Sequence, residues 1–290
     1  MSHAEVQVVT PSFLRTWPLE QEGTSKRARG SVLVIGGAAR TPGGVLLAGV
    51  ASLRVGAGSL QLAVAESVAA SMAVGFPEAG VIGLPQTTTG SVRGTGADRL
   101  AGAVETADVV LLGPGLDDAE HTATLVTALM SMLRPGTTLV LDAYALGVLP
   151  GLDLDDILRG RTALTPNESE ASRLLGKEPD EELGEHAVSD IPTRYGAVVS
   201  CRGSIAAADD RRWEISTGHR GLATAGSGDV LAGTVAGLAA RGGELAQAVC
   251  WATHLHAAAG DRLATRVGPQ GFLARELLDE LPQVMLELTA

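Results

Sequence analysis

The pattern in this sequence best suited to chemistry is a glycine turn followed by an acid, Gly226-Ser227-Gly228-Asp229. Residues 230–240 after it are apolar and rich in glycine and alanine, which predicts a helix. Backbone N–H groups of such a turn can approach a phosphate closely, and the positive end of the helix dipole attracts it. Asp229 could then act as general base toward a hydroxyl beside the phosphate. The same residues also fit a simple turn before a helix that begins with an acid, so the turn alone leaves both interpretations open.

Other well-defined ligand motifs are missing from the sequence. No Gly-Lys-Ser/Thr ends a Walker loop, and Gly36-Gly37 after the first apolar run does not complete a dinucleotide-binding fingerprint. Cys201 and Cys250 lie far apart and lack the spacing of a metal site or a disulfide framework. We therefore expect two buried thiols and no zinc.

The elements that must position the turn are short apolar runs alternating with helical patterns. Strands are predicted at residues 31–35, 60–64, 107–112, 138–142, 161–164 and 197–201, with a hairpin at 205–208 and a further run at 213–216. Strands separated by helices imply right-handed crossovers. We predict an α/β fold of three layers, with a doubly wound, mostly parallel sheet and helices on both faces.

In open α/β sheets, ligands bind beyond the carboxyl ends of the strands. Several turns and polar residues follow directly after predicted strands. They are Gly36-Gly37, residues 113–115, Asp142, Asn167, Arg202-Gly203 and residues 226–229. We expect this set to gather on one edge of the sheet and to form the active site.

Length and composition limit the remaining possibilities. The chain has 290 residues and a formal net charge of −11, which argues against a nucleic-acid partner. No apolar stretch is long enough to cross a membrane and no signal peptide begins the chain, so we expect a cytoplasmic protein. No linker or repeat divides the sequence. We predict an extended N-terminal lead-in over residues 1–30 and one domain over residues 31–290.

Segments along almost the whole chain resemble one known family, the ADP/ATP-dependent NAD(P)H-hydrate dehydratases of the ribokinase-like superfamily. The segments that carry the resemblance are residues 42–44, 51–58, 113–116, 141–143, 164–170, 202–203, 218–233 and 254–261. Many landmarks in the same order are far more specific than one glycine turn. The resemblance implies a hydro-lyase that repairs NADH or NADPH hydrated on the nicotinamide ring.

The resemblance also implies a mechanism and a set of site residues. ADP or ATP, with Mg²⁺, phosphorylates the ring hydroxyl, and elimination restores the dihydronicotinamide. Asp229 is the catalytic base in this scheme. Glu170 is expected to act on the metal through water. The residues implied to bind the nucleotide are Arg202, Gly203, Ser204, Ile205, Ala206, Gly226, Ser227 and Gly228, and those implied to bind the hydrated cofactor are Gly44, Gly115, Asn167 and Asp229.

Three positions depart from the family pattern. Tyr144 stands where the family usually has an acid, Asn167 where it has histidine, and Arg202 where it has lysine. Two other functions therefore stay open. One is a kinase of the same superfamily for a vitamin precursor or sugar, favoured by the Asn167-x-x-Glu170 spacing; the other is a nucleotide-binding module without turnover.

The family resemblance further implies partners beyond the substrates. We expect a homo-oligomer, specifically a tetramer. Some relatives carry a fused epimerase module, for which residues 1–30 are too few, so a separate NAD(P)H-hydrate epimerase is an expected functional partner.

Overall fold

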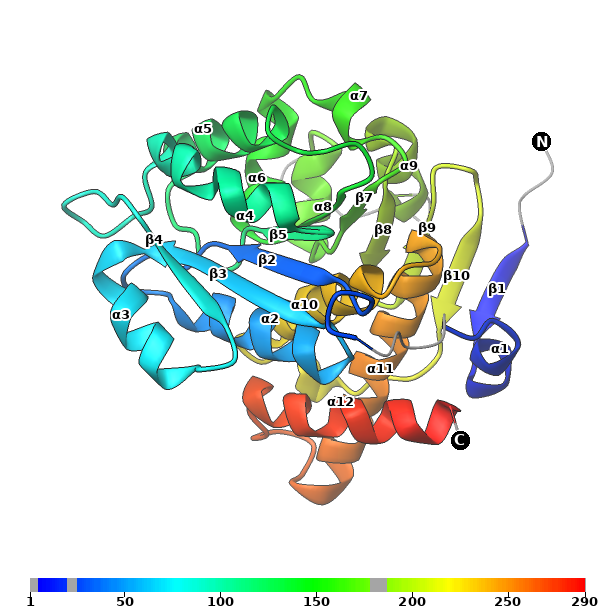
Figure 1. Cartoon of the computed structure of the whole chain (residues 1–290). Helices are drawn as coiled ribbons and strands as arrows, with labels where there is room; N and C mark the ends of the chain where they lie inside the picture. The colour runs from blue at the N-terminus through cyan, green and yellow to red at the C-terminus, as the bar shows by residue number, and fades with distance from the viewer. Residues whose placement is uncertain (1–4, 20–24, 178–186, 290) are drawn as a thin grey trace.

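Ten strands form one sheet in the computed structural model, which describes residues 5–19, 25–177 and 187–289 (Figure 1). The order across the sheet is β1-β10-β9-β8-β7-β6-β5-β2-β3-β4. The strands are β1 (Val6–Val9), β2 (Ser31–Ile35), β3 (Ser59–Ala65), β4 (Gly80–Leu84), β5 (Val109–Leu112), β6 (Thr138–Leu141), β7 (Thr162–Leu164), β8 (Val198–Cys201), β9 (Ser204–Ala206) and β10 (Arg212–Ile215). Among these strands only β9 runs antiparallel to its neighbours.

The strand order reverses between β2 and β5. From β2 the chain builds outward through β3 to β4, and then returns across β2 to begin β5, β6, β7 and β8 on the other side. At such a switch point two neighbouring crossovers leave in opposite directions and open a crevice at the carboxyl ends of the strands. The fold therefore places its ligand crevice between the ends of β2 and β5.

Both faces of the sheet are buried because its strands are apolar on both sides. In β2, Val32 and Val34 belong to one hydrophobic cluster, whereas Leu33 and Ile35 belong to the other. The first face is covered by α1 (Pro11–Thr16), α2 (Gly43–Arg54), α3 (Glu66–Gly75), α10 (Ser227–Ala240), α11 (Leu245–Arg266) and α12 (Ala274–Thr289). The opposite face is covered by η1 (Gly94–Leu100), α4 (Ala101–Thr106), α5 (Ala119–Met130), α6 (Tyr144–Val148), η2 (Leu149–Gly151), α7 (Asp155–Leu158), α8 (Glu168–Leu174) and α9 (Ala187–Tyr195). The predicted three-layer, mostly parallel fold is confirmed.

Helices α2 and α10 pack unusually closely because glycines on α10 face α2. A Cβ added to Gly233 would lie 2.1 Å from the carbonyl oxygen of Ala48, and one added to Gly237 would lie 2.4 Å from that of Ser52. The pairs Ala48–Gly233 and Ser52–Gly237 advance by four residues on both helices. The two helices therefore run side by side in the same direction, with both N-termini at the edge of the sheet that holds the crevice.

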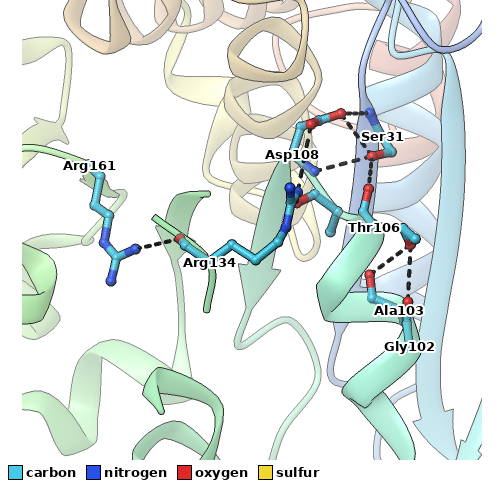
Figure 2. A network of polar contacts seen from close by, with 8 residues as sticks. Ser31, Gly102, Ala103, Thr106, Asp108, Arg134 and Arg161 are labelled. Carbon is cyan, nitrogen blue, oxygen red and sulfur yellow. Dashed lines mark hydrogen bonds and ion pairs between the residues drawn. The ribbon is translucent and has the colours of Figure 1, made fainter. Parts of the chain in front are cut away.

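The opposite edge, at the amino ends of the strands, is held by polar contacts (Figure 2). The Asp108 carboxylate accepts hydrogen bonds from the backbone N–H and the hydroxyl of Ser31, both at 2.9 Å, which joins the starts of β2 and β5. Arg134 donates to the carbonyl of Ala107 at 2.8 Å, and Arg161 donates to the carbonyl of Arg134 at 3.0 Å. These bonds join successive strand starts at the edge away from the crevice.

Within the predicted N-terminal lead-in, residues 1–30, the described residues form β1 and α1. Strand β1 pairs in parallel with β10, and Trp17 after α1 stacks on Trp213 of β10 with ring centroids 5.8 Å apart. The Trp17 carbonyl accepts hydrogen bonds from Gln247 at 3.1 Å and Trp251 at 2.9 Å. This parallel pairing joins residues 6–9 to residues 212–215, which lie far apart in the sequence, so no local pattern predicts it. Strand β4 was likewise not predicted.

Within the described ranges, no helix is long and apolar enough to span a membrane.

The close packing of α2 and α10 can be tested by filling one glycine. Gly233→Ala places a methyl group against the Ala48 backbone, so we expect the free energy of unfolding to fall by about 1–3 kcal/mol. Gly102→Ala is the matched control, since a Cβ there meets no atom within 4 Å and alanine favours the helix by up to about 1 kcal/mol. Thermal and urea unfolding of both variants measures the difference. A Gly233→Ala protein as stable as the parent would show that the helices do not pack this closely.

Candidate active site

Gly44, Gly115 and Asp229 meet at the crevice between β2 and β5. A Cβ added to Gly44, near the start of α2, would lie 3.0 Å from the Oδ1 of Asp229 and 3.1 Å from the backbone nitrogen of Gly115. Gly115 itself has a φ of +69°, and a Cβ there would lie 2.2 Å from the carbonyl oxygen of Thr41. Any side chain at Gly44 would therefore fill the space beside the Asp229 carboxylate, and only glycine suits the conformation at Gly115.

The loops after β2 and β5 are joined by backbone hydrogen bonds, which fixes these positions. The N–H of Gly37 donates to the carbonyl of Pro114 at 2.8 Å, and the N–H of Ala38 donates to that of Gly115 at 2.8 Å. The Thr41 hydroxyl donates to the same Gly115 carbonyl at 2.7 Å. These hydrogen bonds hold the loop after β2 and the loop after β5 together at one edge of the sheet.

The glycine turn opens α10 as the sequence indicates. Gly226 lies directly before the helix with a left-handed φ of +87°, and the N–H groups of Ser227 and Val230 donate to nearby carbonyls. Between them, the N–H groups of Gly228 and Asp229 have no hydrogen-bond partner within the described residues. Free N–H groups in the first turn of a helix are the groups that bind phosphate oxygens. The turn thus offers an anion site directly beside the Asp229 carboxylate.

Two aspartates at this edge have pKa values that their surroundings raise toward neutral pH. Burial and the nearby Glu170 carboxylate raise the pKa of Asp229 to about 6. Burial and the charge of Asp229 raise the pKa of Asp142 to about 7, against the lowering effect of a 2.8 Å hydrogen bond from the Thr165 hydroxyl. A carboxylate with a pKa near 6 is a stronger base than an exposed aspartate and is still ionised at neutral pH. Asp229 can therefore accept a proton from a bound hydroxyl.

Asp142 was expected at this edge but was given no chemical role. Its coupling to Asp229 arises because the end of β6 and the start of α10 lie close in space, and the 86 residues between the two aspartates hide this from the sequence. Directly after Asp142, Ala143 adopts a left-handed φ of +49° and turns the chain into α6. Tyr144, which stands where an acid was expected, is exposed at the start of that helix.

Asn167 and Glu170 form a helix cap. The Asn167 side-chain oxygen accepts from the N–H of Glu170 at 2.9 Å, and the Glu170 carboxylate accepts from the N–H of Asn167 at 2.9 Å. This reciprocal pair is a capping box that starts α8. The spacing that suggested a metal site therefore has a structural explanation. The box uses the Asn167 side-chain oxygen and leaves the amide NH₂ group available as a hydrogen-bond donor.

The side chains near Glu170 limit how a metal ion could bind here. Across the described ranges, no group of three or more histidine, cysteine or carboxylate side chains is arranged to hold a metal ion. One Glu170 oxygen is already engaged in the cap, and desolvation raises the pKa of its carboxyl group. The described part of the chain thus offers no metal cage of its own. A cation that arrives on nucleotide phosphates would fit, with Glu170 near it through water.

The predicted nucleotide segment forms the hairpin between β8 and β9. Arg202 and Gly203 make a two-residue turn in which both φ angles are positive, +51° and +85°. The Arg202 guanidinium makes an ion pair with Glu168 in the first turn of α8. Ile205 and Ala206 are buried within β9, so they can contribute shape and backbone but no side chain to a ligand. Of this segment, the turn and Ser204 lie nearest the carboxyl end of β8.

Known proteins resemble this chain over most of its length. The family model described as NAD(P)H-hydrate dehydratase matches residues 32–283. The ADP-dependent (S)-NAD(P)H-hydrate dehydratase of Xanthomonas campestris is 42% identical over 294 residues, and the match covers 98% of each chain. The bifunctional NAD(P)H-hydrate repair enzyme Nnr of Moorella thermoacetica is 33% identical over 99% of this chain, which spans 55% of that relative.

A solved structure is similar to this chain over nearly its whole length. The ADP/ATP-dependent NAD(P)H-hydrate dehydratase of Bacillus subtilis, co-crystallized with ATP/Mg²⁺, superimposes with a TM-score of 0.80 at 26% identity, over 98% of this chain and 99% of that one. The resemblance predicted from the ordered segments is thereby confirmed. On the family match over most of its length and on its identity to these relatives, the chain belongs to the NAD(P)H-hydrate dehydratase family.

Proposed function

We propose that this protein removes water from hydrated NADH or NADPH in a reaction that consumes ADP or ATP, and so restores the reduced cofactor. The observation that carries the proposal is the meeting of Gly44, Gly115 and Asp229 beside the free N–H groups of the first turn of α10. The relatives named ADP-dependent or ADP/ATP-dependent dehydratases support the same reaction. Family membership alone would leave the residues unassigned.

The proposed mechanism uses the two features of this turn in sequence. The N–H groups of Gly228 and Asp229 hold the terminal phosphate of the nucleotide, and the Asp229 carboxylate accepts the proton of the ring hydroxyl. The hydroxyl oxygen then attacks the phosphorus, which releases AMP from ADP or ADP from ATP. The ring phosphate leaves with its C–O bond electrons, the neighbouring ring carbon loses a proton, and the dihydronicotinamide double bond forms. A Mg²⁺ ion carried by the nucleotide would supply charge neutralisation on the phosphates.

The other site residues have proposed roles in binding. Gly44 and Gly115 provide backbone surface and space for the hydrated ring, and Asn167 donates to the substrate from its amide. Arg202, Gly203 and Ser204 contact the nucleotide, while Ile205 and Ala206 shape the hairpin and Gly226 with Ser227 sets the turn. Glu170 acts on the metal through water. These assignments rest on the family resemblance and on the placement of the residues at one edge.

The kinase alternative loses its distinguishing feature. It rested on the Asn167-x-x-Glu170 spacing, which the capping box of α8 explains without a metal. Asp229 would be the base in either reaction, so the choice of substrate separates them. The match to dehydratases over nearly the full chain favours the dehydratase.

Assembly, location and partners are further parts of the proposal. We propose residues 31–290 as the catalytic domain, and the described part of residues 1–30 extends its sheet. We also propose that the protein forms a homotetramer and acts in the cytoplasm. In the bifunctional Nnr relatives, this chain corresponds to about half of the length. The relatives named bifunctional support a NAD(P)H-hydrate epimerase as a functional partner of this chain.

Replacing the proposed base tests the reaction. Asp229→Asn keeps the shape and the backbone N–H but cannot accept the proton, so we expect kcat to fall by about 10²–10⁴-fold while ADP still binds. Recovery of the dihydronicotinamide absorbance from hydrated NADH with ADP or ATP gives the rate. Asp98→Asn, an exposed change in η1, is the control and should leave the rate unchanged. A parent protein that binds nucleotide but restores no absorbance would instead be a binding module.

The pH dependence of the rate follows from the raised pKa of Asp229. Because the base acts when ionised, kcat/KM should rise with pH through about 6 and level off above it. Removing the Glu170 charge lowers the pKa of Asp229, so in Glu170→Gln the rise should move to lower pH, and glutamine preserves the capping box. Glu120→Gln, on the exposed start of α5, serves as the control. A rise at the same pH in Glu170→Gln would contradict the assignment of Asp229 as the titrating base.

A further inference from the structure

One buried histidine contacts the phosphate turn from behind. The Nε2 of His256, on α11, lies 2.9 Å from the hydroxyl oxygen of Ser227 and 3.0 Å from the Ser227 carbonyl oxygen. Both side chains are buried, and Ser227 is the first residue of α10, two positions before Asp229. No role of His256 in the reaction follows from the mechanism above, yet it is bonded to the peptide that forms the proposed phosphate site.

The carbonyl contact fixes the state of the ring. A carbonyl oxygen can only accept, so the Nε2 of His256 must carry a hydrogen and donate it to Ser227. Burial lowers the pKa of His256 to about 4, so the ring is neutral in the physiological range. A charged ring would also be repelled by the positive end of the α10 dipole. His256 therefore acts as a neutral donor and leaves the attraction between the helix and a phosphate undiminished.

The geometry of the peptide links this bond to the phosphate site. The peptide between Ser227 and Gly228 is planar and trans, so its C=O and N–H point in opposite directions. A carbonyl held inward by His256 keeps the Gly228 N–H, which has no partner in the described residues, pointing outward from the helix end. Ser227 is the first residue of α10, and Gly226 before it has a left-handed φ of +87°, so this peptide lies where the turn meets the helix.

We propose that His256 is a positioning residue, which orients the Ser227–Gly228 peptide so that its N–H meets the transferring phosphate of the nucleotide. The inference rests on the proposed nucleotide site at the start of α10. It predicts that a donor at the position of Nε2 is required, whereas the histidine ring itself is not.

His254 provides a matched control on the same helix. It is buried like His256 and lies two residues before it, but its Nδ1 has no hydrogen-bond partner in the described part of the chain. Among the described residues, the only side chain that forms hydrogen bonds with Ser227 is that of His256. A change at His254 reports the cost of altering a buried histidine in α11 without changing the phosphate turn.

The experiment compares two substitutions of His256 whose side-chain amides differ in length. In His256→Gln the terminal NH₂ stands near the position of Nε2 and can donate to Ser227, whereas in His256→Asn it is too short. ADP binding to the full chain is measured by titration calorimetry, with His254→Gln and His254→Asn in parallel. We expect the dissociation constant for ADP to rise by about 10-fold or more in His256→Asn, and by less than about 3-fold in His256→Gln and in both His254 variants.

Kinetics with hydrated NADH separate positioning from a general structural effect. In His256→Asn the KM for ADP should rise while the KM for hydrated NADH stays unchanged, and melting without nucleotide shows whether the variant is folded. ADP binding as tight in His256→Asn as in the parent protein would overturn the inference. If that variant fails to fold, His256→Gln still decides, because weak ADP binding by a folded glutamine variant would overturn it equally.

Failure of the proposed reaction would look different. A parent protein that binds ADP but does not dehydrate hydrated NADH contradicts the proposed function, and the comparison of asparagine with glutamine still tests His256. A parent protein that binds neither ADP nor ATP removes the nucleotide site, and the inference fails with it.

Discussion

The site depends on the close parallel packing of α2 and α10. Because Gly233 and Gly237 carry no side chains, the backbones of the two helices approach closely in a register that advances by four residues on each. One step earlier in the same register, Gly44 faces Asp229. Contact between the two helices therefore sets the distance between the start of α2 and the Asp229 carboxylate. Two helix N-termini then point their positive ends at one place, which favours an anion there.

Concentrating ionised acids at this edge is unfavourable for folding. Asp142 and Asp229 both have pKa values raised by burial and by neighbouring carboxylates, so their ionised forms are less stable here than in the unfolded chain. The opposite edge has the reverse character, since Asp108 is matched there by donors from Ser31. One edge holds the strands in register with satisfied polar groups, and the other keeps unsatisfied groups available for a ligand.

Most of the fold could be predicted because its signals are local. Apolar runs that end in turns located β2, β3, β5, β6, β7 and β8, and the glycine turn located the start of α10. What could not be predicted depends on distant partners: β1 exists because β10 is beside it, and Trp17 is placed by Trp213. In the site, the same limit applies to the coupling of Asp142 with Asp229. The Asn167 and Glu170 spacing was noticed for its chemistry, but the nearer explanation is the hydrogen bonding of a helix start.

The energies at Arg202 indicate that its contribution to stability does not explain the presence of an arginine there. A residue with a Cβ at φ +51° costs about 1 kcal/mol relative to glycine, which two-residue hairpin turns usually employ at such positions. Its ion pair with Glu168 is exposed on both sides, and such pairs contribute about 0–1 kcal/mol. Stability therefore gains little from an arginine here. The ion pair does join the hairpin to the helix that Asn167 caps, so a ligand phosphate that attracts Arg202 would act on the substrate side of the crevice as well.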